Sequence, residues 1–286
     1  METANETVSD LDLPRLGEPP TPIFQPTPDN PPWNSLVAVG VWIASVLAII
    51  IVPTIFVLPY IVSQGPGFTD NQALGEFLQQ DPWAIILQMI AIIPAHLLTI
   101  AVAWAVVTRA RTFSFKETLG WETGGMGWWH YAAILAVFFA IAIVVGNYVP
   151  EQENELTRIL KSSRYAVFII AFMATFTAPL VEEVIYRGLL YSAFQRTLGV
   201  GFGVAAVTIL FALVHVPQYY PSYSTIFLLL LLSLTLTVVR AVTGNLWPCI
   251  VLHTVFNGVQ SILLILEPYL NTEKPVVDPT ALFFPR

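Results

Sequence analysis

The sequence contains few charged residues and almost no cysteine. Only 11% of its 286 residues are charged, whereas soluble domains contain about 25%. The single cysteine, Cys249, has no second thiol with which to form an intrachain disulfide. Its 12 lysines and arginines, against 19 aspartates and glutamates, form no cluster. These absences argue against a disulfide scaffold and against a nucleic-acid-binding protein, which needs a basic surface to neutralise phosphates.

Long apolar runs dominate the rest of the chain. Hydrophobic residues make up 56% of it, and the mean hydropathy is +0.70. Apolar runs of about 20 residues are typical of bilayer-spanning helices. We therefore predict an all-α polytopic integral membrane protein, a helical bundle with about seven or eight transmembrane helices. The predicted spans are 36–61, 83–107, 128–149, 165–181, 204–216, 225–239 and 246–266, and the first of these regions is long enough to hold an eighth. The helix of the fourth span is expected to continue past Arg187 as an amphipathic helix to Arg196.

The chain ends and loops differ from these spans in composition. Residues 1–33 are acidic and rich in proline, which predicts a disordered N-terminal tail, and 268–286 are expected to form a C-terminal tail. The loop at 109–127 carries basic residues, whereas 63–82 carries none. The positive-inside rule then places the N-terminus in the cytoplasm. The size of the chain and its short loops favour a bacterial plasma membrane.

A few polar residues interrupt the last four apolar runs. A charge at the centre of a membrane helix costs about 2.5–3.5 kcal/mol, so such residues indicate a functional site. Glu183 and Arg187 are four residues apart and share one helix face, while Glu182 points about 100° away from Glu183. The candidate site residues are Glu182, Glu183, Arg187, His215, His253 and Asn257.

These groups suit the addition of water to an amide bond. A carboxylate among apolar helices can take a proton from water, and a histidine can fix that water's position, as Glu182 and His215 could do. His253 and Asn257, four residues apart, could donate two hydrogen bonds to an oxyanion. No serine, cysteine or aspartate stands in a convincing nucleophile setting, so direct attack by water is favoured over an acyl-enzyme.

Three motifs, in chain order, resemble those of a known membrane family. They are Glu182-Glu183-x-x-x-Arg187-Gly188, Phe211-x-x-x-His215 and His253-x-x-x-Asn257. The chain resembles here the CAAX protease and bacteriocin-processing (Abi) family of intramembrane endopeptidases, whose type II CAAX prenyl endopeptidases cut isoprenylated C-terminal motifs. The likeness covers about residues 165–260.

The resemblance implies a role for each motif residue. Glu182 would be the general base, His215 would position the water, and His253 with Asn257 would form the oxyanion site, supported by Glu183 and Arg187. It also implies a catalytic transmembrane domain at 151–267, preceded by N-terminal transmembrane helices at 34–150. The expected partners are the lipid bilayer and a membrane-associated peptide or protein, either prenylated or carrying another lipid anchor.

Metal dependence stays open at this point. Members of the family are often described as metalloproteases, and Glu182, His215 and His253 could supply three ligands to zinc, leaving a fourth position for water. A His-Glu-x-x-His helix, which places two ligands on one turn, is absent from the sequence. We therefore favour a metal-free glutamate mechanism over zinc.

Two other functions remain as alternatives. A non-proteolytic immunity or scaffold protein could use the same polar cavity to bind a peptide. A proton-coupled transporter could use buried glutamate and histidine as relay groups, although the chain shows no internal repeat of the kind from which many transporters are built.

Four further polar residues are expected to have structural roles. His96 and His130 are predicted to pack or to form hydrogen bonds between helices. Arg196 and Arg240, near the ends of predicted spans, are predicted to reach the membrane surface as snorkelling anchors.

Overall fold

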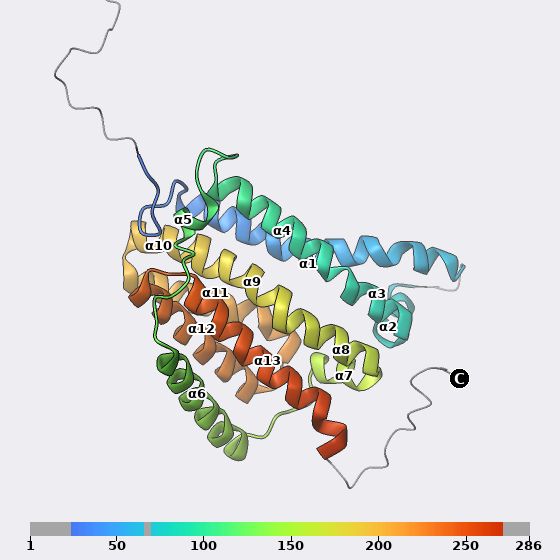
Figure 1. Ribbon diagram of the computed structural model, residues 1–286. Coiled ribbons are helices and arrows are strands. Elements are labelled where there is room, and N and C mark those ends of the chain that lie inside the picture. The colour runs from blue at the N-terminus through green and yellow to red at the C-terminus, as the bar shows by residue number, and fades with distance from the viewer. Residues whose placement is uncertain (1–23, 66–69, 271–286) are drawn as a thin grey trace, which may run out of the picture.

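The computed structural model describes residues 24–65 and 70–270, and every regular element within them is a helix (Figure 1). The helices before the polar site are α1 Ser35–Ser63, α2 Asn71–Gln80, α3 Pro82–Ile90, α4 Ile92–Val107, α5 Phe115–Leu119, α6 Trp128–Tyr148 and α7 Glu155–Ser162. The helices from the span that carries Glu182 onward are α8 Arg164–Phe172, η1 Met173–Thr177, α9 Ala178–Glu183, η2 Val184–Leu190, α10 Tyr191–Leu198, α11 Val200–Tyr219, α12 Tyr223–Thr243 and α13 Trp247–Leu270.

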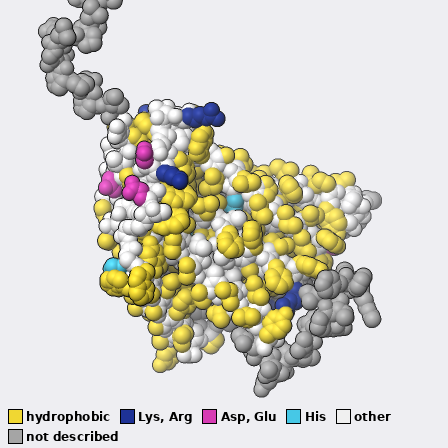
Figure 2. Space-filling view, viewed as in Figure 1, with side chains coloured by type: hydrophobic (Ala, Val, Ile, Leu, Met, Phe, Trp, Pro, Cys, Tyr) yellow, Lys and Arg dark blue, Asp and Glu magenta, His cyan; other side chains and the backbone are white. Residues whose placement is uncertain are grey.

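Seven of the described helical segments are long and apolar enough to cross a membrane. Helices α3 and α4 together form one span, and α8 to α10 form another. The predicted all-α polytopic bundle is thereby confirmed. Figure 2 shows the corresponding surface, in which hydrophobic side chains cover much of the visible face.

The fourth predicted apolar run, 165–181, is the first half of a longer helix, whose expected continuation to Arg196 is confirmed. The helical segment continues without a break over Arg164–Leu198, a length of 35 residues. The glutamates therefore lie near the middle of this segment rather than at its end. The apolar run ends at the glutamates, but pairing of Glu183 with Arg187 allows both of these charges to be buried within the continuing helix.

Two π-helical segments, η1 and η2, bracket α9 within this long span. Such segments are rare and occur frequently at functional sites. In η1 the N–H of Ala178 bonds to the carbonyl of Met173, five residues back. The next residue, Pro179, has no N–H with which to continue this pattern. The carbonyl of Ala174 is therefore left for another donor.

Proline also explains why the second span consists of two helices. Pro94 cannot donate a hydrogen bond to the carbonyl four residues earlier, and the helix is interrupted at Ala91, between α3 and α4. In contrast, α1 continues through Pro53 and Pro59. Its N-terminus is capped by the side chain of Asn34, which accepts a hydrogen bond from the N–H of Val37.

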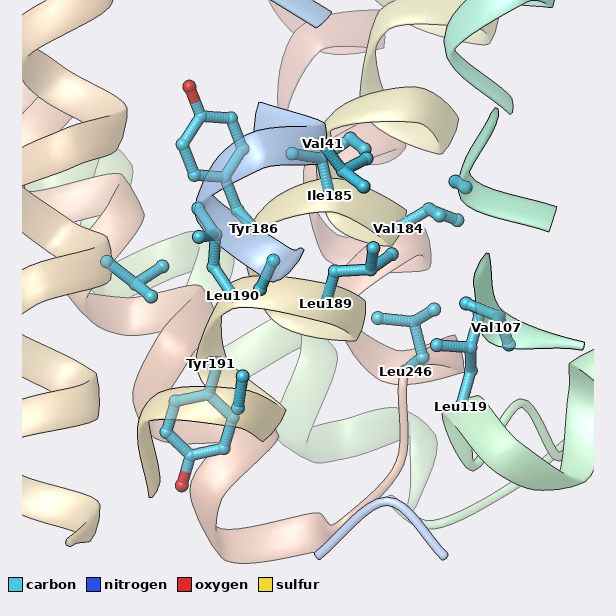
Figure 3. Close-up of a cluster of buried hydrophobic side chains, with 14 of the residues drawn as sticks. Val41, Val107, Leu119, Val184, Ile185, Tyr186, Leu189, Leu190, Tyr191 and Leu246 are labelled. Atoms are coloured by element: carbon cyan, nitrogen blue, oxygen red, sulfur yellow. The ribbon is translucent and has the colours of Figure 1, made fainter. Parts of the chain in front are cut away.

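The main hydrophobic core surrounds η2, where all seven residues are buried. Val184, Ile185 and Leu189 pack there with side chains of α1, α4, α5 and α11 (Figure 3). Helix α6 lies at the edge of the bundle (Figure 1), and Phe138 is its only buried residue. The polar site is thus carried by the best packed part of the molecule.

The N-terminal segment 24–34 lies against one end of the bundle. The indole N–H of Trp33 donates to the carbonyl of Leu189 at 3.1 Å, and the side chain of Gln195 donates to the carbonyl of Pro28. The tail predicted over 1–33 is therefore wrong for residues 24–33, because these hydrogen bonds fix them. Residues 1–23 and 271–286 lie outside the described residues, while 268–270 belong to α13.

Candidate active site

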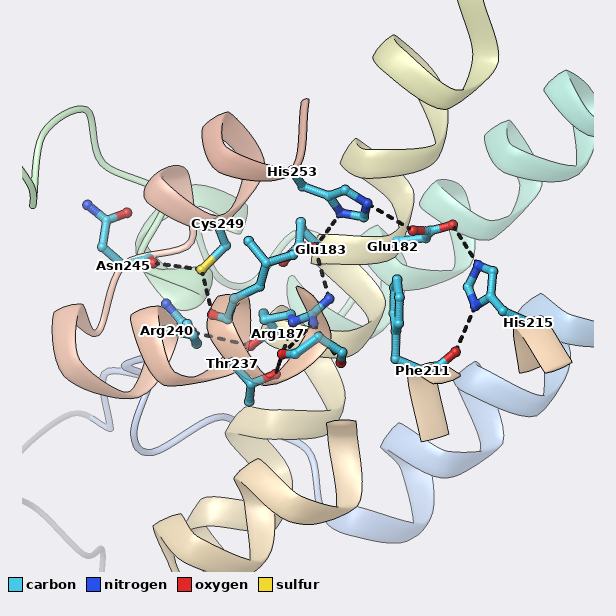
Figure 4. Close-up of polar contacts among 12 residues, drawn as sticks. Glu182, Glu183, Arg187, Phe211, His215, Thr237, Arg240, Asn245, Cys249 and His253 are labelled. Carbon is cyan, nitrogen blue, oxygen red and sulfur yellow. Dashed lines mark hydrogen bonds and ion pairs between the residues drawn. The ribbon is translucent and has the colours of Figure 1, made fainter. Parts of the chain in front are cut away.

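The two adjacent carboxylates at the end of α9 point in different directions, as predicted. The side chain of Glu183 is fully buried, whereas that of Glu182 is 23% exposed. Successive residues on a helix are separated by about 100°, so the two carboxylates reach opposite sides of His253, and each has one further partner of its own (Figure 4). One of them is held inside the bundle and the other remains accessible.

Glu183 joins two neighbouring groups through a single oxygen. Its Oε1 accepts a hydrogen bond from Arg187 Nη1 at 2.9 Å and lies 2.8 Å from Nδ1 of His253 on α13. A carboxylate only accepts hydrogen bonds, so Nδ1 of His253 carries the proton in this contact. The predicted support by Glu183 and Arg187 thus has a visible route to His253, which the sequence did not reveal.

Arg187 is itself held by α12. Its Nη2 donates to the hydroxyl and the carbonyl of Ser233, at 2.9 Å and 3.0 Å, and its Nε donates to the hydroxyl of Thr237 at 3.2 Å. The guanidinium also lies 4.9 Å from the ring centre of Phe211, close enough for a cation–π interaction. This fully buried cation therefore has partners on each of its three nitrogens.

Sequence reasoning missed Ser233 and Thr237. The available signal was two hydroxyl residues four positions apart in a leucine-rich span, because residues at this spacing share one helix face. Arg240 was also misjudged. It is only 1% exposed, and its side chain donates to the carbonyls of Arg187 and Gly244. It therefore stabilises the interior instead of reaching the membrane surface.

His215 is oriented by its own helix. Its Nδ1 lies 2.7 Å from the carbonyl oxygen of Phe211. A carbonyl can only accept, so Nδ1 donates, and Nε2 of the neutral ring keeps its lone pair. This Nε2 lies 3.8 Å from Oε1 of Glu182. The second residue of the Phe211-x-x-x-His215 motif is thus fixed in one tautomer by the first.

His253 approaches the other oxygen of Glu182. Its Nε2 lies 3.7 Å from Oε2, and its side chain is only 3% exposed. The structure therefore brings together Glu182, His215 and His253 from α9, α11 and α13, with one imidazole on each carboxylate oxygen (Figure 4). Three of the four side chains predicted to line one cavity thus lie together.

Asn257 lies one turn beyond His253 on α13. Its Nδ2 donates to the carbonyl of Ala174 at 2.8 Å. This is the carbonyl that would bond to residue 179 in the π-helical pattern if Pro179 had an N–H. In this structure Asn257 therefore replaces a missing backbone donor and fixes η1 to α13, while the second hydrogen of its amide is not used in this bond.

The turn before α13 fixes the start of this helix and thereby the position of His253 along it. The side-chain oxygen of Asn245 accepts from the N–H of Trp247 at 2.9 Å, and its amide donates to the carbonyl of Glu122 at 2.8 Å. Gly244 has a φ of 63°, a left-handed conformation that glycine adopts without strain. The start of α13 is thereby fixed to the loop that precedes α6.

The remaining histidines have structural surroundings, as predicted. Nδ1 of buried His96 on α4 lies 3.0 Å from the hydroxyl of Thr177, which is a contact between two spans. His130 stacks on Trp129, with their ring centres 3.5 Å apart.

Arg196, the other arginine predicted to be a snorkelling anchor, donates to the carbonyl of Pro31 at 2.6 Å.

Glu182, His215 and His253 are the residues that could supply ligands to zinc. Both histidines donate through Nδ1 to an oxygen, which is the arrangement that leaves Nε2 free for a metal. Within the part of the chain that the structure describes, however, no three His, Cys, Asp or Glu side chains form a group that could hold a metal ion. As placed, Glu182, His215 and His253 do not form such a group.

Seven membrane-length helices and an internal cluster of glutamates and histidines define an integral, multi-pass membrane protein with a polar site among its spans. Residues 164–259 match the family model described as type II CAAX prenyl endopeptidase Rce1-like. The match covers about a third of the chain, from α8 into α13, and includes all three motifs. The predicted family resemblance is confirmed for this segment, which supports a protease of the CAAX endopeptidase type. No curated protein and no solved structure matches the chain.

Proposed function

We propose that the protein is an intramembrane endopeptidase that hydrolyses a peptide bond by direct attack of a water held between Glu182 and His215. The observation that carries this proposal is the position of two acceptors. Oε1 of Glu182 and Nε2 of His215 are 3.8 Å apart, and a single water can lie about 2.8 Å from both. With its two hydrogens directed at these acceptors, the water presents a lone pair to a substrate carbonyl.

The proposed reaction needs only the side chains of this site. Glu182 takes one proton while the water oxygen bonds to the carbonyl carbon, whose C=O bond becomes a C–O⁻ bond. Glu182 then gives that proton to the amide nitrogen, and the C–N bond breaks to release an amine and a carboxylic acid, which passes its remaining proton to the amine or to water. General acid–base catalysis of this kind contributes about 10²- to 10⁴-fold to the rate.

His253 is the proposed donor to the oxyanion. Its Nδ1 is bound to Glu183, so only a doubly protonated ring can donate through Nε2. The carboxylate of Glu183 stabilises this imidazolium, and Arg187 balances the charge of Glu183. The free hydrogen of the Asn257 amide is the proposed second donor, since two donors lower the energy of an oxyanion more than one.

The proposed substrate is a membrane-associated peptide, with a prenylated CAAX-type C-terminus as the first candidate because of the family match. The test uses the full-length protein in lipid nanodiscs with a farnesylated CAAX peptide and its unfarnesylated copy. Mass spectrometry should show one internal cleavage of the farnesylated peptide. Absence of cleavage in both peptides by a folded protein would contradict the proposed substrate.

The same preparation separates the remaining alternatives. A chelator titration, accompanied by zinc analysis of the protein, should leave the cleavage rate unchanged, because the proposed steps use no metal. Loss of cleavage on chelation, restored by zinc, would overturn the metal-free mechanism while leaving the protease intact. Binding of the peptide without cleavage, equal in the native protein and in Glu182→Gln, would favour a non-proteolytic peptide-binding protein.

A further inference from the structure

A separate surface cavity, broadly open to its surroundings, lies where the start of α1 meets the end of α4. Its volume is about 440 Å³, and none of its lining residues belongs to the Glu182 site. Most of its wall is apolar, formed by side chains of the N-terminal segment and the two helices, and one residue is charged. The lining residues are Pro32, Trp33, Val37, Ala105, Val106, Arg109 and Ala110.

The charged end of this cavity is a strained turn. Arg109, Ala110 and Arg111 have φ values of 43°, 53° and 85°, and a non-glycine residue in this region costs about 1–2 kcal/mol. The turn is fixed by hydrogen bonds, including that from the N–H of Arg111 to the hydroxyl of Thr108 at 3.1 Å. Strain of this kind persists where surrounding contacts impose it, and it clusters at ligand-binding positions.

This turn presents two arginines at the end of a membrane span. Arg109 lies over the ring of Phe113 at 5.9 Å, and Arg111 lies over Trp104 at 6.0 Å. Arg109 also donates to the carbonyl of Pro32 at 3.0 Å. Across residues 24–65 and 70–270, neither guanidinium forms an ion pair with a carboxylate. Both side chains are exposed and can accept an anion.

The walls of the cavity suit an acyl chain. Val37 is exposed on the outer face of α1, and Val106 belongs to the last turn of the span that ends at Val107. Trp33 is held in place by its hydrogen bond to the carbonyl of Leu189. A ligand that fits therefore has an anionic group at the span end and a hydrocarbon chain that continues along α1 and α4.

From this combination we propose that the cavity is a binding site for an anionic phospholipid, with its phosphate on Arg109, which lines the cavity, and with Arg111 of the same turn as a second cation outside it. Planar guanidinium groups suit phosphate oxygens because they can donate two parallel hydrogen bonds. Basic pockets at the ends of membrane helices bind anionic lipid headgroups for this reason. The net charge of the protein is −7, so overall charge does not account for retention of anionic lipid. The inference does not depend on the proposed protease activity.

The test measures lipid retention by native mass spectrometry of the full-length protein. The protein is released from nanodiscs that contain phosphatidylcholine with a minor fraction of phosphatidylglycerol. The native protein should retain phosphatidylglycerol selectively, and Arg109→Gln/Arg111→Gln should retain it more weakly, by roughly fivefold for each arginine removed. Equal retention by the native protein and this variant would overturn the proposal.

Two further variants keep the test decisive. Arg158→Gln/Lys161→Gln removes the same charge from α7, where each cation is already paired with a glutamate, and it should retain phosphatidylglycerol like the native protein. Val37→Trp fills the cavity while keeping both arginines and should reduce retention. Displacement of the lipid by millimolar inorganic phosphate would identify a site for free phosphate and would contradict the lipid assignment.

Discussion

Glu183 holds the imidazole of His253, with Oε1 of the carboxylate 2.8 Å from Nδ1 of the ring. The same oxygen accepts a hydrogen bond from Arg187, so a fully buried ion pair fixes the orientation of a histidine in the candidate site. Glu182, one residue earlier, lies 3.7 Å from the opposite nitrogen of that ring. The adjacent glutamates therefore act on His253 from both sides, and only Glu182 is accessible to water or substrate.

Removing the charge of Glu183 should destabilise the protein. In Glu183→Gln the buried guanidinium of Arg187 loses its counter-charge, and breaking a buried pair in this way costs about 3–5 kcal/mol. We expect a corresponding fall in the free energy of unfolding, measured by denaturant titration in detergent. The exposed Glu117→Gln, on α5, is the control and should change stability little. A loss below about 1 kcal/mol for Glu183→Gln would contradict the structural role of this pair.

Thr237 should influence the site although it does not touch it. Thr237→Val leaves Nε of Arg187 without its acceptor, which should cost about 1–3 kcal/mol and lower kcat more than it raises KM. Thr237→Ser keeps the hydroxyl and should restore both quantities. Thr235→Val is the matched control because the Thr235 hydroxyl donates to the carbonyl of Leu231 in its own helix, and among the described residues it has no contact with Arg187. Equal effects of Thr235→Val and Thr237→Val would refute a role through Arg187.

Asn257 and Pro179 should be energetically coupled. Asn257→Ala leaves the carbonyl of Ala174 without its donor, at a cost of about 1–3 kcal/mol. In a Pro179→Ala background the backbone regains an N–H that can reach this carbonyl, so the same substitution should cost less. A double-mutant cycle on the free energy of unfolding measures the difference. Strict additivity would show that the carbonyl is not shared between the two residues.

Most of the fold could be predicted from the sequence because burial in lipid leaves a strong signal. Seven apolar runs predicted seven spans, and the structure has seven such segments. The signal failed where polar atoms satisfy one another. The helix stays fully buried past Glu183 because Arg187 pairs with that residue. Residues 24–33 are fixed because Gln195 and Arg196 bond to their carbonyls. Neither interaction leaves a periodic pattern of apolar residues in the sequence.

The ionisable residues of the candidate site could be predicted from the sequence, but the groups that support them could not. Glu182, His215 and His253 stood out because ionisable side chains are rare in membrane helices, and their spacing gave the shared faces. Ser233 and Thr237 did not stand out, since hydroxyl side chains in helices commonly bond to their own backbone. The π-helical segments around α9 were also missed, because an extra residue in one turn shifts the helical period only locally.

The central claim, that Glu182 and His215 hold one attacking water, is tested most directly by a double-mutant cycle on single-turnover cleavage of the farnesylated peptide. Glu182→Gln and His215→Phe should each lower the rate by about 10²-fold or more, with His130→Phe as the unaffected control. Because both residues act on the same water, the double variant should be little slower than the slower single variant. Fully multiplicative losses, or a Glu182→Gln variant that cleaves at the native rate, would contradict the account.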